Sequence, residues 1–151
     1  MANSDTSFDQ IITHTIVINS DPVDVWRALT EPQLMNQWMF ESELEIITDW
    51  KIGSPIIIKG SLEFSDFENK GILLKYEPKR ILQYSHLSSL SALPDQLKSY
   101  TIIEFRLTPE NGQTNLTLTL SNFPTRAIYH HFAFYWIITL DILRKFCESL
   151  G

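Results

Sequence analysis

A change of hydrophobic period within residues 18–39 constrains the fold of this chain more than any other feature. Before it, residues 12–18 alternate between apolar and polar, as in a strand with one buried face. After it, apolar side chains recur at helical spacing. At the junction, Asn19, Ser20 and Asp21 offer capping oxygens, and Pro22 suits a first helical position, which needs no backbone donor. The pattern predicts a strand followed directly by two short amphipathic helices.

Each of the two predicted helices carries a tryptophan. Trp26 shares the apolar side of the first helix, and the sequence "TEP" restarts a second helix that reaches Trp38 and Met39. In that helix Leu34 stands four residues before Trp38, so the two side chains share one face. We predict that both tryptophans pack in the interior.

Strand-like segments separated by turn residues fill the middle of the chain. They are residues 44–48, 55–64, 71–76, 80–86, 100–107 and 114–120. The sequence "SDFEN" at 65–69 reads as a turn, and Asn111-Gly112 is a strong hairpin signal. The alternation in the last two segments predicts an antiparallel sheet with one buried face. Residues 87–99 are too long for a tight hairpin, so they form either a lid or a merely mobile connection.

The helical period returns at about residue 126 and continues to about residue 149. One stripe of this helix is apolar and predicts packing on the sheet, so the expected fold class is α+β. Phe134, Ile137 and Ile138 project to the other side. We expect something to cover these three residues: the 87–99 segment, the start of the chain, or a second copy in a homodimer.

Four segments together resemble one known family. They are "INSDPVDVWRALTEPQLMNQWM", "GILLKYEPKRILQYS", "TIIEFRLTPENGQTNLTLTLSNFP" and "YWIITLDILRKF". Their order resembles the START-related helix-grip superfamily (SRPBCC, the birch-pollen-allergen-like fold), and within it the homologues of the activator of the heat-shock protein ninety ATPase. The resemblance implies a curved seven-stranded antiparallel sheet gripping the long C-terminal helix. It also implies a cavity between them that the short helices close at one end.

Length and composition bound the remaining possibilities. The 151 residues suit a single domain spanning 1–151, with about residues 1–9 as a flexible N-terminus. A lone cysteine, Cys147, and the lack of a signal-peptide pattern lead us to expect a cytoplasmic protein without a membrane span. With a net charge of −6 and no basic cluster, the chain is not expected to bind nucleic acid.

No motif for a metal, a nucleotide cofactor or a catalytic nucleophile stands out, so none of these is expected. The candidates that remain are side chains whose phase points toward the expected cavity. The candidate ligand-contacting residues are His14, Met39, Tyr84, His86, Phe105, Phe123, His131, Tyr135, Trp136 and Thr139.

Three functions fit these residues. The first is a protein that binds an apolar or amphipathic small molecule between the sheet and the C-terminal helix. The second is a cyclase-like or lyase-type enzyme in which His14, His86 or His131 exchanges protons with a carbonyl ligand. The third is a chaperone-linked module for protein interaction, as the family resemblance suggests.

Overall fold

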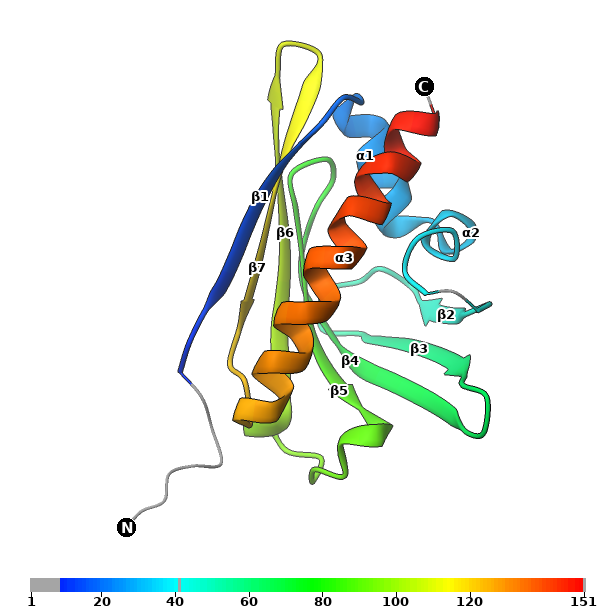
Figure 1. Ribbon diagram of the computed structural model, residues 1–151, viewed down its shortest axis with the longest axis vertical. Coiled ribbons are helices and arrows are strands. Elements are labelled where there is room, and N and C mark those ends of the chain that lie inside the picture. Colours follow the sequence, from blue (N-terminus) through cyan, green and yellow to red (C-terminus); the bar gives the residue numbers. More distant parts are fainter. Residues whose placement is uncertain (1–8, 41, 151) are drawn as a thin grey trace.

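The computed structural model describes residues 9–40 and 42–150 (Figure 1), so nearly all of the expected flexible N-terminus lies outside the described residues. The strands are β1 (Ile12–Ile18), β2 (Glu45–Thr48), β3 (Pro55–Ser61), β4 (Asp66–Glu77), β5 (Ile81–Ser88), β6 (Thr101–Glu110) and β7 (Gln113–Ser121). The helices are α1 (Pro22–Thr30), α2 (Pro32–Met35) and α3 (Arg126–Leu150), with short 3-10 helices at Ser89–Ser91 and Leu97–Ser99.

The seven strands form one antiparallel sheet in the order β1-β7-β6-β5-β4-β3-β2. The segment with α1 and α2 carries the chain from one edge of the sheet to the other, and β2 to β7 then return as a meander. Figure 1 shows α3 lying across one face, with its first turns near the β5–β6 connection and its end near α1. The predicted α+β helix-grip fold is confirmed.

Trp38 and a proline explain how α1 ends. The Ala28 carbonyl would normally accept a hydrogen bond from residue 32, but that residue is Pro32, which has no N–H. The indole Nε1 of Trp38 donates to this carbonyl instead, at 2.8 Å. Trp26 is also buried and packs edge-on against Tyr76, with ring centroids 5.4 Å apart. Both tryptophans are therefore interior, as expected.

The predicted second helix proved too long. Only Pro32–Met35 is helical, and Trp38 and Met39 follow in a turn whose backbone N–H groups reach back to the Met35 carbonyl. This turn frees Met39 from the helix and brings its backbone carbonyl within hydrogen-bonding reach of α3, where the Tyr135 hydroxyl donates to it.

The predicted turn at residues 65–69 is wrong, because β4 already begins at Asp66. The chain turns earlier, where the Leu62 N–H donates to the Ser65 carbonyl at 2.6 Å. Charged and amide residues in this stretch suggested a loop, yet they occupy a strand whose Phe67 and Asn69 face a cavity. Consistently, β3 stops at Ser61 and does not reach residue 64.

Two glycines allow the sheet to close around that cavity. A Cβ at Gly60 would lie 2.6 Å from the Phe67 ring, so glycine is what lets this ring cross β3. At Gly71 a Cβ would lie 1.7 Å from the Ser85 carbonyl oxygen, next to the irregular pairing of β4 with β5.

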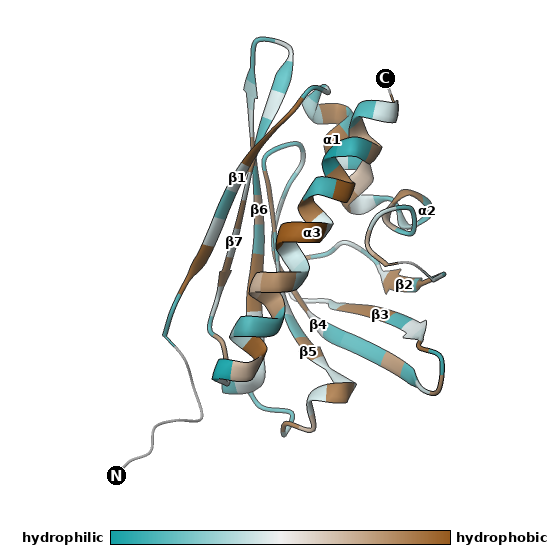
Figure 2. Cartoon of the chain, in the orientation of Figure 1, coloured by the Kyte–Doolittle hydropathy of each residue, from teal (hydrophilic) through white to brown (hydrophobic). Residues whose placement is uncertain are grey.

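The helix α3 buries one side and exposes another. Trp136, Leu140, Leu143 and Cys147 are almost fully buried against the sheet and α1. On the opposite side Phe134 is 71% exposed and Ile137 60%. Figure 2 shows the hydrophobic stretch in the middle of this helix. Within the described residues, no helix is both long enough and apolar enough to cross a membrane.

Candidate functional site

A cavity of about 450 Å³ lies between the first half of α3 and strands β3 to β6. Its apolar lining is Met39, Phe40, Leu44, Ile58, Leu62, Phe67, Leu87, Leu90, Ile103, Ile128, Phe132 and Trp136. Its polar lining is Asn69, Tyr84, His86, Ser88, Ser91, Ser99, Thr101, His131 and Tyr135. Aspartate, glutamate, lysine and arginine are all missing from these described residues. The cavity wall therefore carries no permanently charged side chain.

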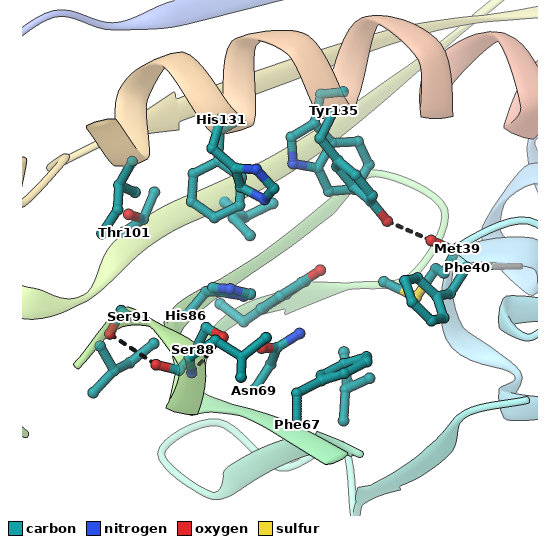
Figure 3. Close-up of a pocket in the computed structure, with 18 of the residues that line it drawn as sticks. Met39, Phe40, Phe67, Asn69, His86, Ser88, Ser91, Thr101, His131 and Tyr135 are labelled. Carbon is teal, nitrogen blue, oxygen red and sulfur yellow. Dashed lines mark hydrogen bonds between the residues drawn. The ribbon is translucent and has the colours of Figure 1, made fainter. Parts of the chain in front are cut away.

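Two histidines face each other across this space (Figure 3). His86 projects from β5 and His131 from α3, and both pack on the edge or face of Phe132 at centroid distances of 5.2 and 5.6 Å. Burial, helped by the nearby His131, lowers the pKa of His86 to about 4. The imidazole of His86 is therefore uncharged at neutral pH, where it has one donor nitrogen and one acceptor nitrogen.

Tyr84 and Tyr135 form a second opposed pair: Tyr84 lies two residues before His86 on β5, and Tyr135 lies one turn after His131 on α3. Tyr84 is only 3% exposed, and burial raises the pKa of its hydroxyl, so it stays protonated. Its hydroxyl has no hydrogen-bond partner in the described part of the chain. Tyr135, in contrast, donates to the Met39 carbonyl. Next to it, the buried Trp136 Nε1 also lacks a partner among the described residues.

The connection between β5 and β6 forms one wall of the cavity. Leu90, Ser91 and Ser99 line it from this segment. Two hydrogen bonds to Asp95 hold the segment in place: Lys70 donates to one carboxylate oxygen and the Tyr100 hydroxyl to the other, both at 2.6 Å. The stretch expected to be a lid or a mobile connection lines the cavity and is hydrogen-bonded to β4 through Lys70.

The structure brings six of the ten candidate residues to this cavity: Met39, Tyr84, His86, His131, Tyr135 and Trp136. The other four lie outside its lining. Phe105 packs against Trp136 at 5.6 Å and Phe123 against Tyr129 at 5.1 Å, both in the core. Thr139 is buried one turn beyond Tyr135, and His14 lies on β1 at the far edge of the sheet. The alternation of residues along a strand indicates which face of the sheet is buried. It does not indicate where on that face side chains fill the space and where a cavity remains.

Several lining residues escaped the sequence analysis, notably Phe67, Asn69, Thr101 and Phe40. Phe67 and Asn69 were missed because their segment reads as a turn. Thr101 is nonetheless in phase with Ile103, which was a usable signal. In the described ranges, no three His, Cys, Asp or Glu side chains come together as a metal site would need.

A seven-stranded sheet closed by a long C-terminal helix over an internal cavity defines the helix-grip class of proteins. The model of one family within this class, "Activator of Hsp90 ATPase homolog 1-like protein", matches residues 19–148. The chain belongs to this family.

Solved structures support the same placement. A protein from Cytophaga hutchinsonii is 34% identical, with a TM-score of 0.76 over 93% of this chain and 94% of that one. Protein CV1439 from Chromobacterium violaceum shares 19% identity, with a TM-score of 0.78 over 91% and 96%. The Aha1 dimer from Colwellia psychrerythraea shares 23%, with a TM-score of 0.72 over 92% and 96%. No curated protein matches the chain.

Proposed function

We propose that this protein binds an uncharged, apolar or amphipathic small molecule in the cavity between α3 and the sheet. The observation that carries this proposal is a cavity of about 450 Å³ with a mostly apolar lining and a few hydrogen-bonding groups left without partners. Ligand sites of proteins have this size and this composition. The Trp136 Nε1 is the sharpest case: it belongs to a lining residue and has no partner among the described residues, and an unpaired buried donor costs stability unless a ligand or water accepts its hydrogen bond.

A cavity-filling substitution tests the proposal. Ile103 lies on the cavity floor, so Ile103→Trp places an indole in the space that a ligand would occupy. Its neighbour Ile102 points to the opposite face of the sheet, which makes Ile102→Trp the matched control. Native mass spectrometry of gently purified protein, followed by thermal-shift measurements with lipids, flavonoids and polyketides, provides the readout.

We expect a co-purifying compound or a thermal shift with the wild type and with Ile102→Trp, and at least a tenfold loss of affinity with Ile103→Trp. If no compound co-purifies and none of the panel raises the melting temperature, the binding proposal is wrong.

A second candidate is acid–base chemistry by the two facing histidines. The observation that favours it is that His86 and His131 share one cavity, whereas His14 does not line it. It ranks second because a pKa of about 4 makes His86 a weak base at neutral pH. Deuterium incorporation next to the carbonyl of a bound ketone, lost in His86→Gln, would support it. A rate equal to that in buffer would exclude it.

A chaperone-linked role comes from the family description alone. It predicts that the protein raises the ATPase rate of an Hsp90-type chaperone from the same organism. An unchanged rate at saturating protein would remove this alternative. The cytoplasm remains the proposed compartment, in keeping with the single buried Cys147.

We also propose that the exposed side of α3, made of Phe134, Ile137 and Ile138, is the contact surface of a homodimer. The support is their exposure, together with the related protein from Colwellia psychrerythraea that was solved as a dimer.

A further inference from the structure

Most of the free polar groups of the cavity lie at one end, beside the β5–β6 connection. Asn69 pairs with Ser88 across β4 and β5, and His86 pairs with Thr101 across β5 and β6. Ser91, whose hydroxyl donates to the Ser88 carbonyl at 2.8 Å, lies beside them. In Figure 3, Ser88, Ser91, His86 and Thr101 lie toward the left of the space, and Asn69 lies nearer its middle. They form a polar end next to the β5–β6 connection.

The other end is apolar. Met39 and Phe40 reach it from the segment after α2, and Phe67 reaches it from β4. The rings of Phe40 and Phe67 meet edge to face at 5.2 Å. The one polar group that Figure 3 labels here, the Tyr135 hydroxyl, already donates to the Met39 carbonyl. The Tyr84 hydroxyl, which lies opposite Tyr135, is the free polar group nearest this end, so less hydrogen-bonding capacity is left here than beside the β5–β6 connection.

At the polar end, that capacity is free. Within the described part of the chain, the side chains of Asn69, His86 and Thr101 have no hydrogen-bond partner. Lys70 on β4 and Asp95 on the β5–β6 connection are engaged with each other at 2.6 Å. A ligand head at this end thus meets amide, imidazole and hydroxyl groups and no unpaired full charge.

We infer that the cavity holds an amphipathic ligand in one orientation, with an uncharged hydroxyl or carbonyl head at the polar end and its apolar body toward Met39 and Phe40. This inference rests on the proposed function and narrows its ligand class. An ionised head is disfavoured, because a charge taken out of water needs an opposite charge that this wall does not supply.

Two probes that share the same alkyl chain and differ in their polar head group test the ligand class. Decan-1-ol and decanoate differ only in the head, and at pH 8 decanoate is ionised while a free imidazole is uncharged. Isothermal titration of the full chain should give at least tenfold tighter binding of decanol. In His86→Phe/Thr101→Val the preference should shrink severalfold, whereas His14→Phe, outside the cavity lining, should keep it.

Nuclear Overhauser contacts test the orientation. The terminal methyl of decanol should contact the Met39 methyl, and its first methylene should contact the Thr101 methyl. Equal affinities for the two probes, or the reverse set of contacts, would overturn the inference and leave the binding proposal standing. If neither probe binds, the inference is wrong, and the co-purification experiment then decides the proposed function separately.

Discussion

His86 links the chemistry of the cavity to the stability of the fold. Its pKa is about 4 in the folded protein and about 6.5 in an unfolded chain, because burial disfavours the imidazolium. Between these values the unfolded chain binds more protons, so acid favours unfolding. The contribution of neutral His86 is complete above pH 6.5 and is lost as the pH falls toward 4.

The expected size of this effect is at most about 3 kcal/mol in the free energy of unfolding. Urea titrations at pH 7 and pH 4.5 measure it, with His86→Phe compared with the wild type. The wild type should lose more stability on acidification than His86→Phe, which has no proton to gain there. His130→Gln, on the exposed side of α3, serves as the control and should follow the wild type. Parallel losses in wild type and His86→Phe would contradict the prediction.

Trp38 donates to the Ala28 carbonyl near the end of α1, and no other described side chain does so. In Trp38→Phe the Ala28 carbonyl stays buried without a partner, since Pro32 has no N–H to offer. We expect a loss of about 2 kcal/mol in unfolding free energy, the usual cost of an orphaned buried acceptor plus some packing. Trp50→Phe is the control, because Trp50 is only partly buried and packs on Tyr76. Equal losses in the two variants, measured by urea unfolding, would show that ring volume and not the hydrogen bond matters.

At the scale of elements, the β5–β6 connection is held by contacts on the protein surface. Lys70, Asp95 and Tyr100 are exposed or partly exposed, so their interactions add little to global stability. They do fix the segment that walls the polar end of the cavity. Asp95→Ala should therefore leave the melting temperature within a few degrees of the wild type while loosening this wall.

Hydrogen exchange followed by mass spectrometry measures that loosening. Amides in residues 89–100 should exchange faster in Asp95→Ala, and a bound ligand should dissociate faster. Asp141→Ala is the control, since Asp141 also accepts from two side chains, the cations Arg144 and Lys145, but on α3 away from the lining. Unchanged exchange in residues 89–100 would mean that the connection is held by its apolar contacts instead.

The elements that the sequence predicted well are those with a strong period or explicit turn chemistry. The β6–β7 hairpin follows from Asn111-Gly112 and two alternating runs, and α3 follows from its long apolar stripe. The wrong predictions concern segments whose polar residues suggested a loop. Residues 65–69 read as a turn because Asp66, Glu68 and Asn69 favour loops, yet pairing with β3 holds them in a strand.

The sequence predicted the cavity but not all of the residues that line it. Periodicity places Phe105 and His86 on the same sheet face, yet one is core and the other lines an open space. The difference arises from how α3 packs: Trp136 covers Phe105 at 5.6 Å, whereas Phe132 meets His86 edge-on at 5.2 Å and both line the open space. Such a void is a property of tertiary packing, and a pattern along one strand does not encode it.

At the scale of the whole molecule, the outer side of α3 has the spacing of a self-complementary surface. Ile138 lies four residues from both Phe134 and Ile142, and all three are well exposed. Two copies of α3 packed antiparallel around a twofold axis at Ile138 would pair each Phe134 with the partner's Ile142. Within the described residues nothing else covers these side chains, and this is why we propose a symmetric contact.

Replacing Phe134 and Ile137 with lysine should convert a dimer into a folded monomer. The two side chains are 71% and 60% exposed, so their replacement leaves the core of the protomer intact. The variant should therefore still unfold cooperatively on heating, as a folded monomer does. Light scattering coupled to size exclusion measures the mass. Ile72→Lys, a similarly apolar and exposed site on β4, is the control and should stay dimeric. A wild type that is already monomeric at tens of micromolar would refute the proposed dimer. In that case there would be no contact between two copies of α3 for the lysines to break.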